Sequence, residues 1–95
     1  MSLLVNPSHP GEVLQELYLV PLGLSSLALA RRIHVPRTRI ERLVKGETAV
    51  SADTAMRLAK VFGTTPEYWM NLQRAWDLAR VRETIDVSGI KPIAA

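Results

Sequence analysis

Basic residues are concentrated in one short segment of the chain, "RRIHVPRTRIERLVKG", at residues 31–46. The segment holds six lysine or arginine residues and a single acid, Glu41, so it carries a formal charge of +5 in a chain whose net charge is +3. Guanidinium and ammonium groups attract anions, and a guanidinium fork also matches the O6 and N7 acceptors of guanine. The segment therefore indicates a local anionic partner, and nucleic acid fits that description.

Helices are expected to position this segment, because the apolar residues in and around it recur at the spacing of one helical face. Proline, glycine and helix-capping residues divide the chain into short helical units. The expected fold class is all-α, with five helices. They run from Pro10 to stops at Pro21 and Gly23, from a cap at Ser25 or Ser26 to Ile33, from about Pro36 to Gly46, from Ser51 to Gly63, and from Thr65 to about Val81.

The second and third expected helices form the pattern of a DNA-binding helix-turn-helix, because both are short, a turn of about four residues joins them and the second of them is basic. The motif occupies about residues 25–46. Ala30 stands where the two helices must approach closely, which requires a small side chain. His34 stands in the turn, where a left-handed backbone usually calls for glycine but also occurs with histidine. We therefore expect a DNA-binding domain over residues 1–82.

Residues that read bases are expected on the exposed side of the third helix. Successive side chains on a helix are about 100° apart, so with Ile40 facing the core Thr38 and Arg42 fall on the opposite side. Arg37 lies in the first turn, at the end that would enter the groove first. Arginine suits guanine, and threonine can offer its hydroxyl or its methyl group to a base. Arg37, Thr38 and Arg42 are therefore predicted to contact bases.

Phosphate contacts are expected from residues at the flanks and ends of these two helices. The predicted set is Ser25, Ser26, Arg31, Arg32, Arg39 and Lys45. Such contacts set the affinity and its salt dependence rather than the sequence preference. The alternative is that the charges only solvate a helix face, with Glu41 paired to Lys45 four residues on. A single acid among seven charges, together with Ala30 and the turn, favours DNA binding.

The fifth expected helix carries more apolar bulk than the core of so small a domain needs. Its large side chains point in several directions, which indicates one contact with the domain core and another with a second subunit. The predicted dimer interface consists of Tyr68, Trp69, Leu72 and Trp76. The alternative places both tryptophans in the core of the monomer. A two-fold homodimer would set its two third helices about 34 Å apart, one turn of B-DNA, and so predicts a palindromic operator.

The last expected unit is a C-terminal segment, residues 83–95, in which the helical pattern is lost. Ile85 and Val87 alternate with polar residues before Gly89 and Pro92 interrupt the pattern. Two interpretations are open: a loosely ordered tail, or a short strand or dimer arm that pairs with another subunit.

Several other functions find little support in the composition. The chain has no cysteine and only two histidines, so neither a metal site nor another cofactor is expected. The sequence shows no nucleophile beside a base, no paired carboxylates and no glycine-rich loop, so an enzyme is not expected. Membrane binding would require the apolar face of the basic helix to contact both the domain core and the bilayer. RNA binding is not favoured either, because outside the fifth helix the sequence lacks the surface aromatic residues on which bases stack. No leader or spanning segment is evident, so a cytoplasmic location is expected.

Three further motifs lie outside the helix-turn-helix: "HPGE" at the first helix, "SADTA" at the fourth and "TPEYWMNLQ" at the fifth. With "VPRTRIERLVKG" they make the chain similar to the HigA-type antitoxins of bacterial addiction modules, also called the virulence-associated protein I type. These belong to the phage-repressor-like (XRE) helix-turn-helix class. The resemblance runs from about Pro7 to Ala79. The three outer motifs make it specific, since the helix-turn-helix alone would indicate only a repressor-like protein.

The resemblance implies a homodimeric DNA-binding domain that represses its own operon and neutralises a HigB/RelE-like toxin, which cleaves mRNA. It places DNA contacts on Ser26, Arg37, Thr38, Arg39 and Arg42, and His34 stands where the family commonly has glycine. The expected location is the bacterial cytoplasm, in association with the nucleoid. The alternative within the same class is a stand-alone repressor-like transcriptional regulator without a toxin partner.

Overall fold

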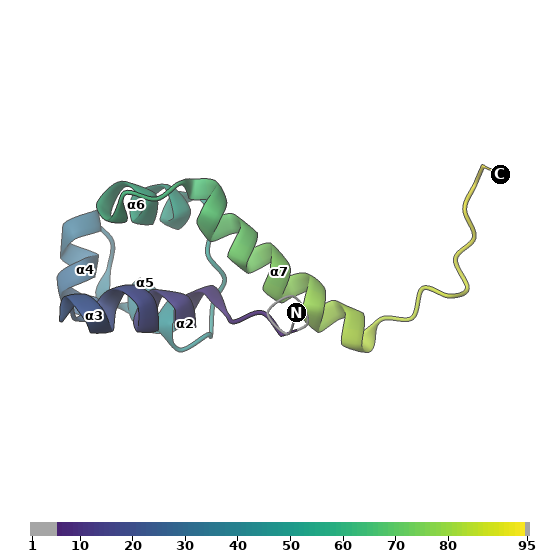
Figure 1. Cartoon of the computed structure of the whole chain (residues 1–95), viewed down its shortest axis with the longest axis horizontal. Helices are drawn as coiled ribbons and strands as arrows, with labels where there is room; N and C mark the ends of the chain where they lie inside the picture. The colour runs from purple at the N-terminus through teal and green to yellow at the C-terminus, as the bar shows by residue number, and fades with distance from the viewer. Residues whose placement is uncertain (1–5, 95) are drawn as a thin grey trace.

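The computed structural model describes residues 6–94; residues 1–5 and 95, which the predicted domain and tail include, lie outside the described part. Within it the chain is helical and contains no strand, so the predicted all-α fold is confirmed (Figure 1). The elements are α2 (Pro10–Leu14), η1 (Gln15–Leu19), α3 (Val20–Leu22), α4 (Ser26–Ile33), α5 (Arg37–Val44), α6 (Ala52–Phe62) and α7 (Pro66–Thr84).

The first helix consists of α2, η1 and α3 end to end, so it continues through Pro21. The prediction of a stop at Pro21 is wrong. Proline has no amide hydrogen to donate to the carbonyl four residues back, and the π turn η1 directly before it changes the hydrogen-bond register at that point. The helix ends at Gly23, whose φ of 62° is left-handed. The Leu24 amide then donates to the Leu19 carbonyl at 2.9 Å, which closes the helix end.

The helix-turn-helix forms through one cap and one left-handed residue. The Ser25 hydroxyl accepts a hydrogen bond from the Ala28 amide at 3.0 Å, so Ser25 rather than Ser26 is the cap of α4. His34 ends α4 with a φ of 61°, which confirms the predicted left-handed turn. Pro36 lies one position before α5 as its N-cap. The turn thereby directs α5 away from α4 while both helices keep an apolar side toward the core.

The last two helices begin as expected. Ser51 and Thr65 cap α6 and α7 with side-chain oxygens that accept an amide hydrogen three residues on, at 3.2 and 3.1 Å. Gly63 ends α6 with a φ of 70°. α7 continues to Thr84, beyond the predicted end near Val81.

The core lies between the first helix, α4, α5, α6 and the inner part of α7. Its buried apolar side chains are Leu14, Leu19, Leu29, Ala30, Ile33, Ile40, Leu43, Val50, Ala55, Leu58, Ala59 and Trp69. No single helix within residues 6–94 is long and apolar enough to cross a membrane; Pro10–Leu22 and Ser26–Ile33 reach that length only as a pair bent by 97°, and both supply side chains to this core.

Trp69 is the largest fully buried side chain of the core. Its ring centroid lies 5.2 Å from that of Tyr18, 6.3 Å from that of Phe62 and 5.1 Å from that of Tyr68. Its indole nitrogen donates to the Thr64 hydroxyl at 2.8 Å, so its one polar atom is satisfied. The prediction that Trp69 faces a second subunit is wrong, because this side chain exposes no surface in its own chain.

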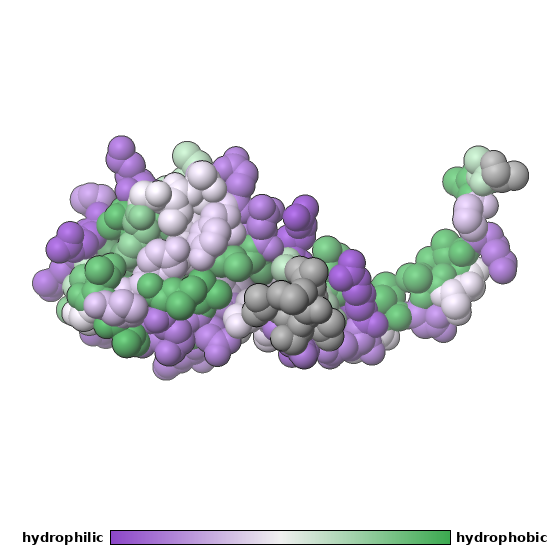
Figure 2. All heavy atoms as spheres, in the orientation of Figure 1, coloured by the Kyte–Doolittle hydropathy of each residue, from purple (hydrophilic) through white to green (hydrophobic). Residues whose placement is uncertain are grey.

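The outer half of α7 and the residues after it extend away from the rest of the molecule (Figure 1). Figure 2 shows hydrophobic side chains along this extension. The exposed large apolar residues there are Leu78, Val81, Ile85, Val87, Ile90 and Ile93. Residues 85–94 are exposed and include no strand, as the interpretation of a loosely ordered tail expects.

Candidate nucleic-acid interface

α5 has one buried and one exposed side, as the rotation of a helix requires. Ile40 and Leu43 are buried in the core. Arg37, Thr38 and Arg42 are exposed, so all three predicted base-reading side chains are accessible to solvent. The buried side fixes the position of α5 against the domain, and its exposed side is free to contact another molecule.

Glu41 pairs with Arg37 and not with Lys45. The Arg37 Nε lies 3.3 Å from Glu41 Oε2, an i,i+4 pair with both side chains largely in solvent. The alternative interpretation, which paired Glu41 with Lys45, therefore named the wrong partner. Exposed pairs of this kind contribute little, about 0–1 kcal/mol, so DNA can compete for Arg37 at small cost.

Arg39 forms an ion pair across two helices that the sequence did not reveal. Its Nη1 donates to Asp53 Oδ2 of α6 at 2.7 Å. Arg57, one turn further along α6, donates to the same oxygen through Nε at 2.9 Å. The hydrogen bond from Arg57, followed by the one from Arg39, lowers the pKa of the Asp53 carboxyl below its ordinary value.

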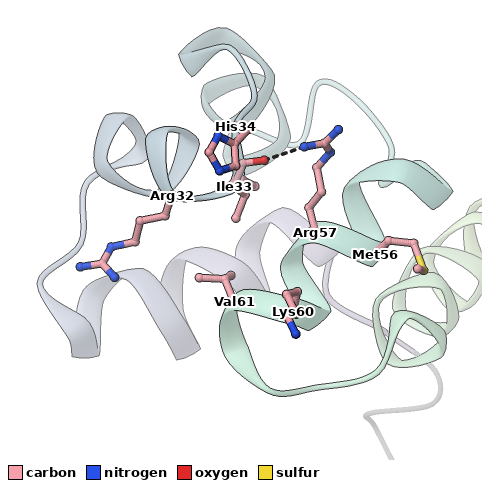
Figure 3. A pocket seen from close by; sticks show the side chains of 7 residues that line it. All are labelled: Arg32, Ile33, His34, Met56, Arg57, Lys60 and Val61. Atoms are coloured by element: carbon pink, nitrogen blue, oxygen red, sulfur yellow. Dashed lines mark hydrogen bonds between the residues drawn. The ribbon is translucent and has the colours of Figure 1, made fainter.

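Arg57 also links α6 to the helix-turn-helix. Its Nη1 donates to the Ile33 carbonyl at 2.8 Å (Figure 3). That carbonyl belongs to the last residue of α4, where helix carbonyls lack partners within their own helix. The Arg57 side chain therefore joins the end of α4 to Asp53 and, through Asp53, to α5. The four-residue spacing of Asp53 and Arg57 could have predicted their i,i+4 ion pair, but it could not have predicted the contacts with Arg39 or Ile33.

The predicted phosphate-binding residues are placed as follows. Arg31, Arg32, Arg39, Lys45 and Ser25 are exposed, and Ser26 is half-buried at the first position of α4. The Ser25 oxygen is occupied as an acceptor by its capping bond, but its hydroxyl hydrogen can still donate to a phosphate oxygen. The first amides of α4 have no partners within the helix, so the amino end of α4 suits an anion.

A cleft of about 470 Å³ lies between the end of α4 and α6 (Figure 3). It is lined by Arg32, Ile33, His34, Met56, Arg57, Lys60 and Val61. Its lining includes the cations Arg32, Arg57 and Lys60, and Figure 3 shows Arg57 reaching to the Ile33 carbonyl while Arg32 points away from the other lining residues. The cleft could not be predicted from the sequence, because its two sides come from α4 and α6, which meet only in the folded chain.

The loop between α5 and α6 is tied to α7 by Gln73. This buried side chain accepts a hydrogen bond from the Val50 amide at 2.8 Å and donates to Asp77 Oδ1 at 2.9 Å. His9 supports the same region from the start of α2. Its Nδ1 accepts from the Gly11 amide at 2.9 Å, and burial lowers its pKa below the ordinary value. These contacts hold the end of α5 without taking part in its exposed surface.

Three other residues of the predicted dimer interface also contact their own domain. Trp76 is half-buried, with its ring edge-on to His9 at 5.2 Å between centroids. Tyr68 and Leu72 are partly buried against the core, and burial raises the pKa of Tyr68 to about 12. Met70 of α7 is exposed near these residues, and two more exposed apolar side chains, Leu78 and Val81, lie further along the helix.

Comparison with known proteins adds a family and a set of relatives. Residues 14–69 match the model of a family described as helix-turn-helix. The chain is 49% identical over 70 residues to virulence-associated protein I of Dichelobacter nodosus, covering 74% of this chain and 65% of that protein. It is 37% identical over 89 residues to antitoxin HigA-1 of Vibrio cholerae, covering 92% and 84% of the two chains.

A solved structure agrees over nearly the whole chain. The antitoxin GraA in complex with its operator superimposes with a TM-score of 0.88 at 35% sequence identity, covering 95% of this chain and 94% of GraA. The two proteins are therefore similar in sequence as well as in fold.

Proposed function

Because the chain belongs to the helix-turn-helix family, and within it to the HigA-type antitoxins, we propose that it is the DNA-binding antitoxin of a toxin–antitoxin operon and represses that operon. The observation that carries the proposal is the exposed surface of α5, where Thr38 and Arg42 lie opposite the buried Ile40 and Arg37 is exposed in the first turn. The operator complex of the similar antitoxin GraA supports it.

The division of labour on this surface follows from side-chain chemistry. Arg37, Thr38 and Arg42 read bases in the major groove of duplex DNA, and each good bidentate contact contributes about 1–3 kcal/mol of discrimination. Phosphates are held by the cations and hydroxyls around them, namely Ser25, Ser26, Arg31, Arg32, Arg39 and Lys45. No cofactor takes part in this function, and the protein acts as a binding module rather than an enzyme.

The active form is a homodimer on a palindromic operator. Residues 1–82 form the DNA-binding unit, and residues 83–95 form a C-terminal tail or an arm that pairs with the second subunit. Since Trp69 is fully buried, the surface for the second subunit is the outer half of α7, where Leu78 and Val81 are exposed and Ile85 follows. Apolar side chains exposed in a row on a helix are typical of a subunit contact. Trp76, Tyr68 and Leu72 form the inner border of this surface.

The protein partner is a HigB/RelE-like toxin, which the antitoxin neutralises in the bacterial cytoplasm. The name of the Vibrio cholerae relative, antitoxin HigA-1, supports this part of the proposal. Association with the nucleoid follows from DNA binding.

Two measurements test the proposal. Fluorescence anisotropy with the promoter of the protein's own operon should give saturable binding that exceeds binding to a scrambled duplex by at least a hundredfold at 0.15 M salt. Co-expression with the product of the adjacent toxin-sized reading frame should restore growth that this product alone arrests. Promoter binding without rescue of growth would make the protein a stand-alone regulator, and absence of both would overturn the proposal.

A further inference from the structure

We infer that Asp53 determines the sequence specificity of DNA binding by holding the Arg39 guanidinium against α6, so that Arg39 does not make indiscriminate phosphate contacts. The inference rests on the proposed DNA-binding function and adds to it a residue outside the helix-turn-helix. Asp53 belongs to the first turn of α6 and is not among the residues that are predicted to contact DNA.

The first argument is geometric. One carboxylate oxygen, Asp53 Oδ2, receives both Arg39 Nη1 at 2.7 Å and Arg57 Nε at 2.9 Å. Arg57 is itself fixed, because its Nη1 donates to the Ile33 carbonyl at 2.8 Å. The carboxylate is therefore held from α6 and, through Arg57, from the end of α4, and its remaining partner is Arg39 of α5. This arrangement gives Arg39 one preferred direction before DNA arrives.

The second argument concerns charge. The basic segment, residues 31–46, has a formal charge of +5, and every free cation in it attracts the backbone of any duplex. Such attraction needs no particular sequence, so a cation that is free to reach the nearest phosphate adds affinity mainly on duplexes where no specific complex fixes its position, and this reduces the ratio between specific and non-specific affinity. Asp53 offsets one of the two positive charges of Arg39 and Arg57, so the three side chains together carry a formal charge of +1. The Arg39 side chain is still 42% exposed, so a phosphate placed correctly can recruit it.

A simpler role must be separated from this one. An acid in the first turn of a helix stabilises that helix through the macrodipole, and Asp53 is such an acid. Glu67 occupies the same kind of position in the first turn of α7, and it makes no ion pair in the described part of the chain. Glu67→Gln therefore reproduces the change in net charge and in helix dipole that Asp53→Asn causes, but leaves Arg39 unaffected.

The experiment measures affinity for two probes by anisotropy between 0.05 and 0.3 M salt. One probe is the duplex that wild-type protein recovers from a randomised pool, and the other is a scrambled duplex of equal length and composition. For Asp53→Asn we expect affinity for the scrambled duplex to rise about three- to tenfold at 0.1 M salt, as one added phosphate contact gives. Its salt slope should steepen by about one, while affinity for the recovered duplex changes less than twofold.

A double-mutant cycle tests whether the effect passes through Arg39. In an Arg39→Ala background, Asp53→Asn should leave the ratio of the two affinities unchanged. Glu67→Gln should also leave it unchanged. Circular dichroism and melting curves establish that each variant folds.

The outcomes distinguish the inference from the function on which it rests. If wild-type protein recovers no common sequence and binds both probes alike, the proposed function fails. If wild-type protein discriminates but Asp53→Asn discriminates equally well, or if its effect persists without Arg39, the inference alone is overturned.

Discussion

Gly11 and Leu43 bring the first helix and α5 into backbone contact. A Cβ atom placed on Gly11 would lie 1.7 Å from the Leu43 carbonyl oxygen and 2.6 Å from its carbonyl carbon. Both obstacles are backbone atoms, so they cannot move aside as the end of a side chain can. The absence of a side chain at Gly11 is therefore a condition for the position of α5, although Gly11 lies in the first turn of a different helix.

Gly11→Ala should destabilise the fold and shift α5. We expect a loss near or above the upper end of the roughly 1–3 kcal/mol typical of overpacking, and a melting temperature lower by about 10 °C or more. Thermal unfolding followed by circular dichroism measures it. Gly89→Ala is the matched control, because a Cβ at Gly89 meets nothing within 4 Å and its φ is not left-handed. Equal melting of the two variants would contradict the close contact.

Gln73→Leu should weaken the connection between α7 and the loop that follows α5. The substitution removes the acceptor of the Val50 amide, and an unsatisfied buried donor costs about 1–3 kcal/mol. Amide hydrogen exchange should show the Val50 amide losing protection before the core amides do. Asn71→Leu changes an exposed amide on the same helix and should leave exchange at Val50 as in the wild type. Retained protection at Val50 in Gln73→Leu would rule out this link.

The burial of His9 makes stability depend on pH. Desolvation lowers its pKa from the ordinary value of 6.5, against the raising effects of Asp77, the Thr48 backbone and Glu12. The folded state thus favours neutral His9, whose Nδ1 accepts from the Gly11 amide. Its contribution is complete above pH 6.5 and is lost as the pH falls through the lowered folded-state pKa.

The corresponding measurement compares melting temperatures at pH 7.5 and 5.5. His9→Asn keeps a side-chain acceptor suited to an N-cap but cannot gain a proton. We expect the wild type to lose more stability between the two pH values than His9→Asn does. A pH dependence that is the same in both proteins would show that another group is responsible.

Arg42→Ala and Lys45→Ala should separate base reading from phosphate binding. Arg42 lies in the last turn of α5, on its exposed side, and Lys45 follows at the C-cap. Arg42→Ala should cost about 1–3 kcal/mol on the operator and relax preference at one base position. Lys45→Ala should weaken all duplexes similarly and reduce the salt slope by about one. Operator titrations in which both variants behave alike would refute this assignment.

Val81→Glu combined with Ile85→Glu should convert the proposed homodimer to a monomer. Both side chains are about half exposed in the single chain, at 47% and 55%, and would be buried between subunits, where a carboxylate without a partner is costly. Sedimentation velocity at micromolar concentration measures the change. Arg82→Glu introduces the same side chain between them without removing apolar surface, and it should remain dimeric. Monomeric wild-type protein would disprove the dimer itself.

Local signals in the sequence predicted the helix ends well. Ser51 and Thr65 cap their helices, and His34 adopts the left-handed turn, because each depends on its own backbone and near neighbours. The stop at Pro21 failed because the π turn that ends at Leu19 places Pro21 among the first residues of the following α-helical segment, where a missing amide hydrogen costs little. Helix ends were thus predictable where the helix kept the regular α-helical hydrogen-bond pattern throughout.

Tertiary relationships were not predictable from these signals. Apolar bulk on the fifth helix predicted a contact with a second subunit as well as with the core, but nothing in its spacing showed that Trp69 would be fully buried beside Tyr18 of the first helix and Phe62 of α6. Likewise, the charge pattern placed Arg39 at a flank of its helix and could not supply Asp53, fourteen residues on, as its partner. Periodicity fixes which side of a helix is apolar but not which neighbour covers it.

α7 joins two regions that have different tasks. In its first half, Gln73 accepts a hydrogen bond from Val50 in the loop that follows α5, whereas its far end exposes apolar side chains. One continuous helix therefore both anchors the loop beside the DNA-facing helix and presents a separate apolar surface, so a molecule that covers Leu78 and Val81 leaves α5 accessible.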